Sequence, residues 1–140
     1  MRSAKEGVAL AAKCWESHLN CAESVLRGVC HAQEMELTDL AKRMATPFGG
    51  GVGRSEDICG ALVGGVLAIG AERGRTTSED DRLRSYDAAG KLHEKFLELF
   101  GSTCCRVLNK SDFKSPEHRM RCGEFVKETT RLTIQILREK

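Results

Sequence analysis

Residues 115–137 read SPEHRMRCGEFVKETTRLTIQIL, and this stretch indicates the fold class. Ser115 is a typical helix cap, and Pro116 suits the first helical turn, where its missing N–H is not needed. Apolar and small side chains then recur every three or four residues, at Cys122, Phe125, Val126, Thr129, Leu132, Thr133, Ile136 and Leu137. This period is typical of one face of an α-helix. The stretch therefore predicts one long amphipathic helix that runs to near residue 140.

Two helices are expected in the N-terminal part of the chain, over residues 4–17 and 21–33. A short polar break separates them, and Asn20 is placed to cap the second helix. Glu23, three residues later, completes the pattern of a capping box. Cys21 is therefore expected in a first helical turn.

Three more helices are expected in the middle of the chain. A short one over residues 38–45 ends before a proline, and Ser55 is the expected cap of a helix that contains Cys59. A third starts at the hydroxyl residues 77 and 78, has acidic residues in its first turn and ends at Gly101. Its expected inner face consists of Tyr86, Ala89, His93, Phe96, Leu97 and Phe100.

Strand signals do not recur anywhere in the chain, so we predict an all-α fold. The length of 140 residues and the hydrophobic content of 41% suit a single domain with one core. The short connections between the expected helices are typical of antiparallel bundles. We therefore expect one helical domain over residues 1–140, built as a bundle of five to six helices.

Composition argues against several classes of function. The 22 basic and 20 acidic residues nearly cancel, and only seven aromatic residues are present, so we expect no nucleic-acid partner. The longest apolar run, residues 58–71, is shorter than the ~20 residues that span a bilayer, so no membrane partner is expected either. The first residues lack the apolar run of a signal peptide, which favours a cytoplasmic location.

No hydrolase site is visible among the polar residues. The sequence lacks a recognisable Ser/His/Asp arrangement or a catalytic pair of carboxylates. His18 is an alternative ligand or proton donor because it lies close to Cys21, whereas His31, His93 and His118 are expected on helix surfaces. Functional chemistry is therefore sought among the thiols.

Cys59 is the first candidate functional residue. It follows the glycine-rich stretch FGGGVG at residues 48–53 and is expected in the first turn of a helix. A thiol there meets the partial positive charge of unpaired N–H groups, which favours the thiolate, the form that attacks disulfides and binds metals. The seven cysteines of the chain suggest metal ligation or redox chemistry, although a single cysteine is often only a small buried hydrophobe.

Repeated glycines in the Cys59 helix also need a reason, because a glycine inside a helix costs about 0.5–1 kcal/mol relative to alanine. Gly60 and Gly64 lie one turn apart. One reason is tight packing, either within the chain or across a homodimer, which is the commonest soluble assembly. The other reason is space around a cofactor sulfur or a substrate at Cys59.

Four motifs together resemble a known family. They are NCAESVL at residues 20–26, the FGGG loop leading into CGALVG at 59–64, FGSTCCRVL at 100–108, and Cys122 at the head of the last helix. The chain is similar, over nearly its whole length, to redox-active proteins named for four cysteines around a Gly-Cys-Ala-x-x-Gly core. It departs from that core at one point, because Ile58 precedes Cys59 and Gly60 follows it.

The resemblance implies which cysteines work together. The functional set is Cys21, Cys59, Cys105 and Cys122, as a cofactor-binding and metal-binding group. Cys105 is preferred over its neighbour because the family's third cysteine usually precedes Arg-x-Leu, and Cys104 remains the alternative. Cys14 and Cys30 lie outside the pattern. Similar domains in some haem-containing relatives look as though they hold an iron–sulfur cluster, which favours a 2Fe–2S or 4Fe–4S cluster here.

Four thiolates from separate segments also match the stoichiometry of an iron–sulfur cluster or an all-cysteine zinc site. Zinc ribbons usually take two ligands from one Cys-x-x-Cys turn, and this chain has no such pair. An iron–sulfur cluster is therefore the first cofactor expected, and the four sulfurs are expected to converge beside the glycine loop.

Three functions stay open, and whether the protein is an enzyme is open with them. The first is electron transfer or redox sensing with an unidentified redox partner protein. The second is a thiol–disulfide oxidoreductase or sulfur carrier with Cys59 as the nucleophile and Cys122 or Cys105 as its disulfide partner. The third is a non-catalytic helical interaction module with structural thiols.

Overall fold

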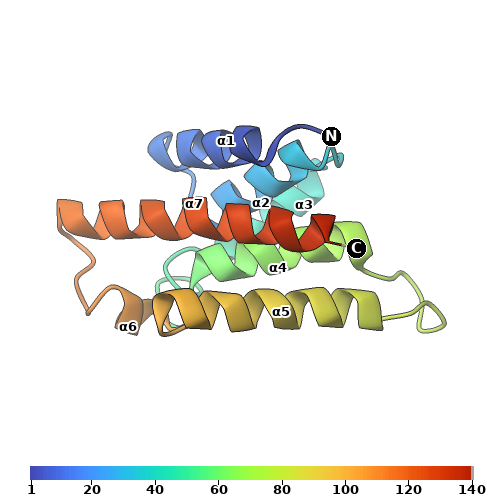
Figure 1. Ribbon diagram of the computed structural model, residues 1–140. Coiled ribbons are helices and arrows are strands. Elements are labelled where there is room, and N and C mark those ends of the chain that lie inside the picture. Colours follow the sequence, from blue (N-terminus) through green and yellow to red (C-terminus); the bar gives the residue numbers. More distant parts are fainter. Residues whose placement is uncertain (140) are drawn as a thin grey trace.

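The last helix, α7 (Pro116–Arg138), is the longest element and organises the rest of the molecule. A computed structural model describes residues 1–139 and shows α7 crossing the middle of the molecule, antiparallel to its neighbours α1 and α5 (Figure 1). The other elements are α1 (Ala4–Glu16), α2 (Cys21–Ala32), α3 (Asp39–Ala45), the 3-10 helix η1 (Thr46–Phe48), α4 (Gly60–Arg73), α5 (Leu83–Phe100) and α6 (Cys105–Leu108).

The all-α prediction is confirmed, but the number of helices is seven rather than five to six among the described residues. The additional helix, α6, has only four residues and is too short to show a periodic pattern. Long-range backbone bonds position it, from Cys105 N to the Asp57 carbonyl oxygen and from Arg106 N to the Glu56 carbonyl oxygen. No local signal in the sequence predicts such contacts.

The inner face of α7 follows the predicted period and packs against α1, α2, α4 and α5. Its buried residues are Cys122, Phe125, Val126, Thr129, Thr130, Thr133, Ile134, Ile136 and Leu137. Ser115 caps the helix, as predicted, by accepting a hydrogen bond from His118 N. One core thus connects the α1–α2 pair on one side of α7 with the α4–α5 pair on the other.

Helix ends confirm some predictions and correct others. Asn20 and Glu23 form the predicted capping box at the start of α2, and Gly101 ends α5 with a left-handed φ of 81°. However, α5 starts at Leu83 and not at residue 77. The acidic residues lie before the helix: Asp80 Oδ2 accepts a hydrogen bond from Thr76 N at 3.4 Å within the preceding loop, and Asp81 Oδ1 accepts one from Leu83 N at 2.8 Å at the helix start.

The predicted inner face of α5 was correct only in part, since Phe96 is buried and Ala89 and Phe100 pack against the core. Ala88, Leu92 and Phe96 are its buried residues, whereas Tyr86 and Leu97 are exposed. The sequence pattern missed Ala88 and Leu92, which form the buried face of α5 together with Phe96.

The start of α4 lies closer to Cys59 than expected. The helix begins at Gly60, with Cys59 as its N-cap residue, so Ser55 is not the cap. The backbone amide of Cys59 donates to the Thr103 carbonyl oxygen at 2.8 Å, which ties this point to the segment before α6. Among residues 1–139, no helix is both long and apolar enough to cross a membrane.

Candidate functional site: a cavity lined by four cysteines

One cavity of about 130 Å³ is lined by Cys21, Cys59, Cys105 and Cys122, and we call it the cysteine cavity. Its remaining lining residues are Trp15, Asn20, Gly50, Gly60, Asn109, Phe113, His118 and Phe125. The structure therefore brings together four side chains that are spread over about a hundred residues of sequence. All seven cysteines are present as free thiols.

Three of the four thiols lie where helices start. Cys21 is the first residue of α2, Cys59 is the N-cap of α4, and Cys105 is the first residue of α6. Cys122 is different. The sequence motif suggested that it lies at the start of the last helix, but it lies in the second turn of α7. Both α4 and α7 start on the side of the molecule where α6 lies, with α7 extending further outward (Figure 1).

The glycine loop closes another side of the cavity. Gly50 lines it, and Gly51 adopts φ of 69°, with the site of a Cβ 2.8 Å from the Cβ of Cys105. A side chain there would be strained and would collide with Cys105. Asn20 fixes the near end of the loop by donating from Nδ2 to the Thr46 carbonyl oxygen at 2.8 Å.

Because Gly60 has no side chain, it leaves room for the sulfur of Cys21. A Cβ on Gly60 would overlap Cys21 Sγ and would lie 2.9 Å from the Phe48 carbonyl oxygen. Further along α4, a Cβ on Gly64 would lie 2.6 Å from the Ala22 carbonyl oxygen, so that glycine allows α2 and α4 to pack closely. Close packing within the chain therefore explains Gly64, whereas Gly60 leaves room for the sulfur of Cys21.

Burial keeps the cavity thiols protonated. It raises the pKa of Cys59 far above its usual range, with a smaller contribution from nearby Cys21, and it raises the pKa of Cys122 to about 12. Burial raises the pKa of Cys21 and of Cys105 as well. Backbone N–H groups near Cys59 lower its pKa, as predicted for a helix start, but desolvation outweighs them. The expectation of a thiolate at Cys59 is therefore wrong for the metal-free protein.

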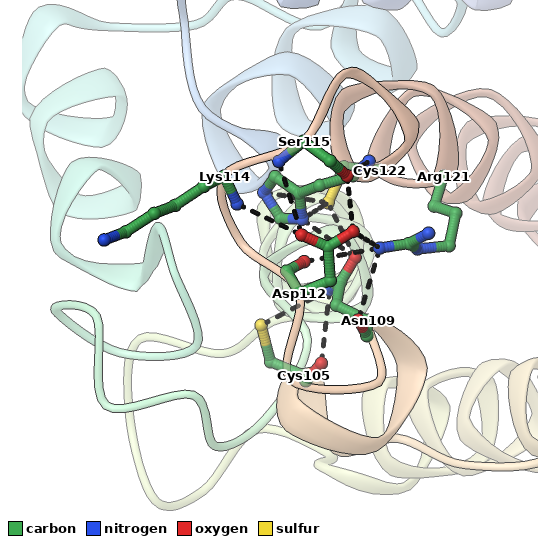
Figure 2. Close-up of polar contacts among 8 residues, drawn as sticks. Cys105, Asn109, Asp112, Lys114, Ser115, Arg121 and Cys122 are labelled. Carbon is green, nitrogen blue, oxygen red and sulfur yellow. Dashed lines mark hydrogen bonds and ion pairs between the residues drawn. The ribbon is translucent and has the colours of Figure 1, made fainter.

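Asn109 bridges two of the cysteines (Figure 2). It is 2% exposed, and its Nδ2 donates to the Cys105 carbonyl oxygen at 3.2 Å and contacts Cys105 Sγ at 3.8 Å. Its Oδ1 accepts from the Cys122 thiol at 3.6 Å and lies 3.0 Å from His118 Nδ1. One buried amide thus positions thiols from α6 and α7 together with an imidazole.

His118 reaches the cavity rather than solvent alone, which corrects its expected place on a helix surface. Its Nδ1 and Nε2 lie 3.8 and 3.9 Å from Cys122 Sγ. Burial lowers the pKa of His118, with further lowering by the charge of Arg121. The sequence did contain a signal for both missed residues, because His118 and Cys122, like Asn109 and Cys105, are four residues apart and so share one side of a helical turn.

A polar cluster anchors the loop that joins α6 to α7 (Figure 2). Arg121 donates to the Asn109 carbonyl oxygen at 3.2 Å and pairs with Asp112 at 3.3 Å. Asp112 also accepts hydrogen bonds from Ser115 and from the backbone of Lys114, and these contacts lower its pKa to about 2. The cluster fixes the relative position of Cys105 and Cys122 by holding the chain between them.

The other cysteines lie apart from this site. Cys14 and Cys30 line a separate cavity of about 540 Å³, and Cys104 is not a lining residue of the cysteine cavity. The Cys104 thiol instead donates to the Glu56 carbonyl oxygen at 3.6 Å. His18 does not line the cavity either.

The profile of the family described as "Putative redox-active protein (C_GCAxxG_C_C)" matches residues 19–136 of this chain. The chain belongs to this family. The matched range includes all four cysteines of the cavity and excludes Cys14. An uncharacterized protein from Archaeoglobus fulgidus is 30% identical over 130 residues, which is 86% of each chain. No solved structure matches the chain.

Proposed function

We propose that Cys21, Cys59, Cys105 and Cys122 hold an iron–sulfur cluster and that the protein uses it for electron transfer or redox sensing. The observation that carries this proposal is the gathering of four thiols, from four different helices, around one small cavity. A cysteine set of this size is the usual ligand set of 2Fe–2S and 4Fe–4S clusters. When bound, such a cluster supplies one-electron redox chemistry.

The surroundings of the sulfurs suit negatively charged ligands. Backbone N–H groups of Ala61 and Leu62 form hydrogen bonds that lower the pKa of Cys59. Those of Ala22 and Gly50 lower the pKa of Cys21 in the same way. The Asn109 amide does the same for Cys105. Hydrogen bonds to the sulfurs stabilise thiolate ligands and tune the potential of a cluster. The donor set and its hydrogen bonds therefore fit the proposed cofactor.

The arrangement differs from a ready-made metal centre. Within residues 1–139, no group of three or more Cys, His, Asp or Glu side chains has metal-holding geometry. The thiols are also protonated, so each must lose a proton before it can become a ligand. We therefore expect cofactor binding to release protons and to move the cavity side chains.

A second proposal is thiol–disulfide exchange or sulfur transfer, and one observation favours it. His118 lies beside the Cys122 thiol, where an imidazole can accept the thiol proton. Cys59, the nucleophile suggested by the sequence, is 5% exposed and has a strongly raised pKa, so it is a poorer candidate in the metal-free protein. Burial raises the pKa of Cys122 as well, to about 12, but Cys122 has the adjacent imidazole, so it is the better nucleophile under this proposal.

The deciding experiment is anaerobic purification or reconstitution with iron and sulfide, followed by analysis of both elements and a visible spectrum. The proposed function predicts a brown protein and stoichiometric iron and sulfide. Cys59→Ser and Cys122→Ser should lose most of the iron, while Cys14→Ser, outside the cavity, should keep it. Circular dichroism identifies any variant that fails to fold. A colourless, iron-free wild-type protein after reconstitution would rule out the cluster.

If the reconstituted protein contains no iron, the thiol–disulfide proposal is tested by oxidising the protein. Under that proposal, mild oxidation should give a disulfide that includes Cys122, and Cys122→Ser should abolish it. If replacing all four cavity cysteines leaves helicity and thermal stability unchanged and no redox activity is found in the wild type, the interaction-module alternative is preferred.

A further inference from the structure

A second depression, about 570 Å³ in volume, lies directly outside the cysteine cavity, and we call it the entrance groove. Trp15, Phe113 and His118 line both the cavity and the groove. These three side chains therefore form the wall between the thiols and the surface. A molecule in the groove is separated from the thiols by one layer of side chains.

One half of this wall is firmly held. The Trp15 indole N–H donates to the Arg119 carbonyl oxygen at 3.2 Å, and the Arg119 guanidinium donates to the Trp15 carbonyl oxygen at 2.8 Å. The guanidinium carbon lies 4.3 Å from the centre of the Trp15 ring, as in a cation–π contact. These contacts fix a positive charge at the rim of the groove and tie the end of α1 to α7.

The other half of the wall belongs to the loop between α6 and α7. Phe113 lies in this loop, and its ring centre is 5.3 Å from that of His118. The backbone on either side is anchored through Asp112 and Ser115, whereas the Phe113 ring is held by packing alone in the part of the chain that the structure describes. A rotation of this one side chain is the smallest change that would connect the groove with the thiols.

The groove carries positive charge without a matching negative charge. Lys114 and Arg119 line it, and no aspartate or glutamate is among its lining residues. Lys114 is exposed and forms no ion pair within residues 1–139. The nearby carboxylate of Asp112 is engaged with Arg121 and Ser115, and Glu117, next to the groove on α7, is not a lining residue.

We infer that the entrance groove is the route by which a small anionic redox compound reaches the cysteine cavity, with Lys114 and Arg119 attracting it and Phe113 as the movable side chain. The inference rests on the proposed function only in taking the four cysteines as the reacting groups. The volume of the groove is in the range of small-molecule sites, and aromatic walls with a few charged groups are typical of them. Carboxylate and phosphate groups match the charge of the rim.

The test uses the reduced, metal-free protein and two disulfide reagents that differ in charge. One is the dianion 5,5′-dithiobis(2-nitrobenzoate), and the other is the neutral 4,4′-dithiodipyridine. A protein thiolate attacks the S–S bond, a mixed disulfide forms, and the other half of the reagent leaves as a thiolate. Labelling is followed at Cys122, which is the one cysteine in the tryptic peptide 122–127.

Lys114→Glu should slow labelling of Cys122 by the dianion about five-fold or more at low ionic strength, because the attraction becomes repulsion. The neutral reagent should change less than about two-fold, and high salt should remove the difference between the reagents. Lys5→Glu is the matched control, since it makes the same charge change at an exposed site near the far end of α1. Equal effects of the two variants on the dianion would overturn the inference.

Phe113→Ala tests the wall itself. It should speed labelling of Cys122 by both reagents, with the Tm measured to show that the fold is kept. Unchanged rates with both reagents in a folded Phe113→Ala variant would mean that the thiols are reached by another route. Because no metal is involved, a charge-selective entrance can be found even if the protein binds no cluster, and a cluster can be found even if the entrance is not charge-selective.

Discussion

The first two turns of α4 contain the same residue type but differ in what surrounds it. At its start, Gly60 leaves room for a sulfur and lies beside a cavity of ionisable thiols. One turn later, Gly64 and Gly65 bring the helix against α2, α5 and α7, where a Cβ on Gly65 would meet Thr133 and Leu92. A glycine in this helix can therefore leave room either for a cysteine sulfur or for a neighbouring helix, depending on which residues surround it.

The largest expected effect concerns pH at the cavity end of α4. Cys59 and Cys122 have pKa values raised by burial, so in the folded protein they keep protons that the unfolded chain loses above its usual thiol pKa near 8.5. The stability that these two protonated thiols contribute is fully present below about pH 8.5. It is lost as the pH rises from there toward the pKa values of the thiols in the folded protein. Each thiol should lower the free energy of unfolding by about 1.4 kcal/mol per pH unit in that window.

Denaturant titrations of the metal-free protein at pH 7, 8, 9 and 10 measure this loss. Lysine and tyrosine also titrate at the upper end, so the readout is the difference between the wild type and a Cys59→Ala, Cys122→Ala double variant. The double variant should show a flatter pH profile. Parallel profiles would mean that the two thiols are not held protonated in the folded state.

The close packing in the second turn of α4 should respond to Gly64→Ala. The new Cβ would lie 2.6 Å from the Ala22 carbonyl oxygen and 2.9 Å from the Val25 Cβ, so α2 and α4 must move apart. We expect a loss of about 1–3 kcal/mol in the free energy of unfolding, as for other overpacked cores. Chemical denaturation measures it, and a variant as stable as wild type would contradict the close packing described for this pair.

Gly60→Ala separates the two roles, because it adds the same methyl group one turn earlier, at the first residue of the helix. The methyl group would overlap Cys21 Sγ, so the side chain of Cys21 must leave its place. Under the proposed function, Gly60→Ala should lose iron during reconstitution, whereas Gly64→Ala should keep binding iron at temperatures where it remains folded. Equal iron contents of the two folded variants would show that Gly60 and Gly64 do not differ in their importance for the cysteine cavity.

Asn109→Ala tests the bridge between α6 and α7 and should have a moderate effect. It removes the donor for Cys105 and the acceptor for Cys122 and His118, and unsatisfied buried polar groups typically cost about 1–3 kcal/mol. We expect a lower Tm and altered alkylation of Cys105 and Cys122, with Cys30 unaffected in its separate cavity. Unchanged alkylation of the two cavity thiols would show that the amide does not position them.

The smallest expected effect is at Gly90, in the middle of α5, where a Cβ would meet nothing within 4 Å. Gly90→Ala should stabilise the protein by about 0.5–1 kcal/mol, because alanine loses less conformational freedom in a helix. It is also the matched control for Gly64→Ala, since both change a helical glycine to alanine. A destabilised Gly90→Ala variant would indicate that this face of α5 is covered in solution.

Local patterns in the chain were sufficient for the helical class, for most helix ends and for the family. The capping box at Asn20, the stop at Gly101 and the inner face of α7 depend on residues a few positions apart, whose preferences are expressed before any tertiary contact forms. The four cysteines were selected by motif resemblance, and the structure places them around one cavity. Local sequence preferences therefore predicted these helical features, and the resemblance to the family predicted the four cysteines.

Other features depend on residues that meet only when the chain folds. The helix α6 is held by carbonyl groups of residues 56 and 57, and the bridge formed by Asn109 needs α6 and α7 side by side. The protonation of the thiols was mispredicted because a helix start lowers a pKa locally, whereas burial by distant segments raises it by more. Desolvation and close packing are properties of the folded neighbourhood, so the tertiary structure alone decided the state of the site.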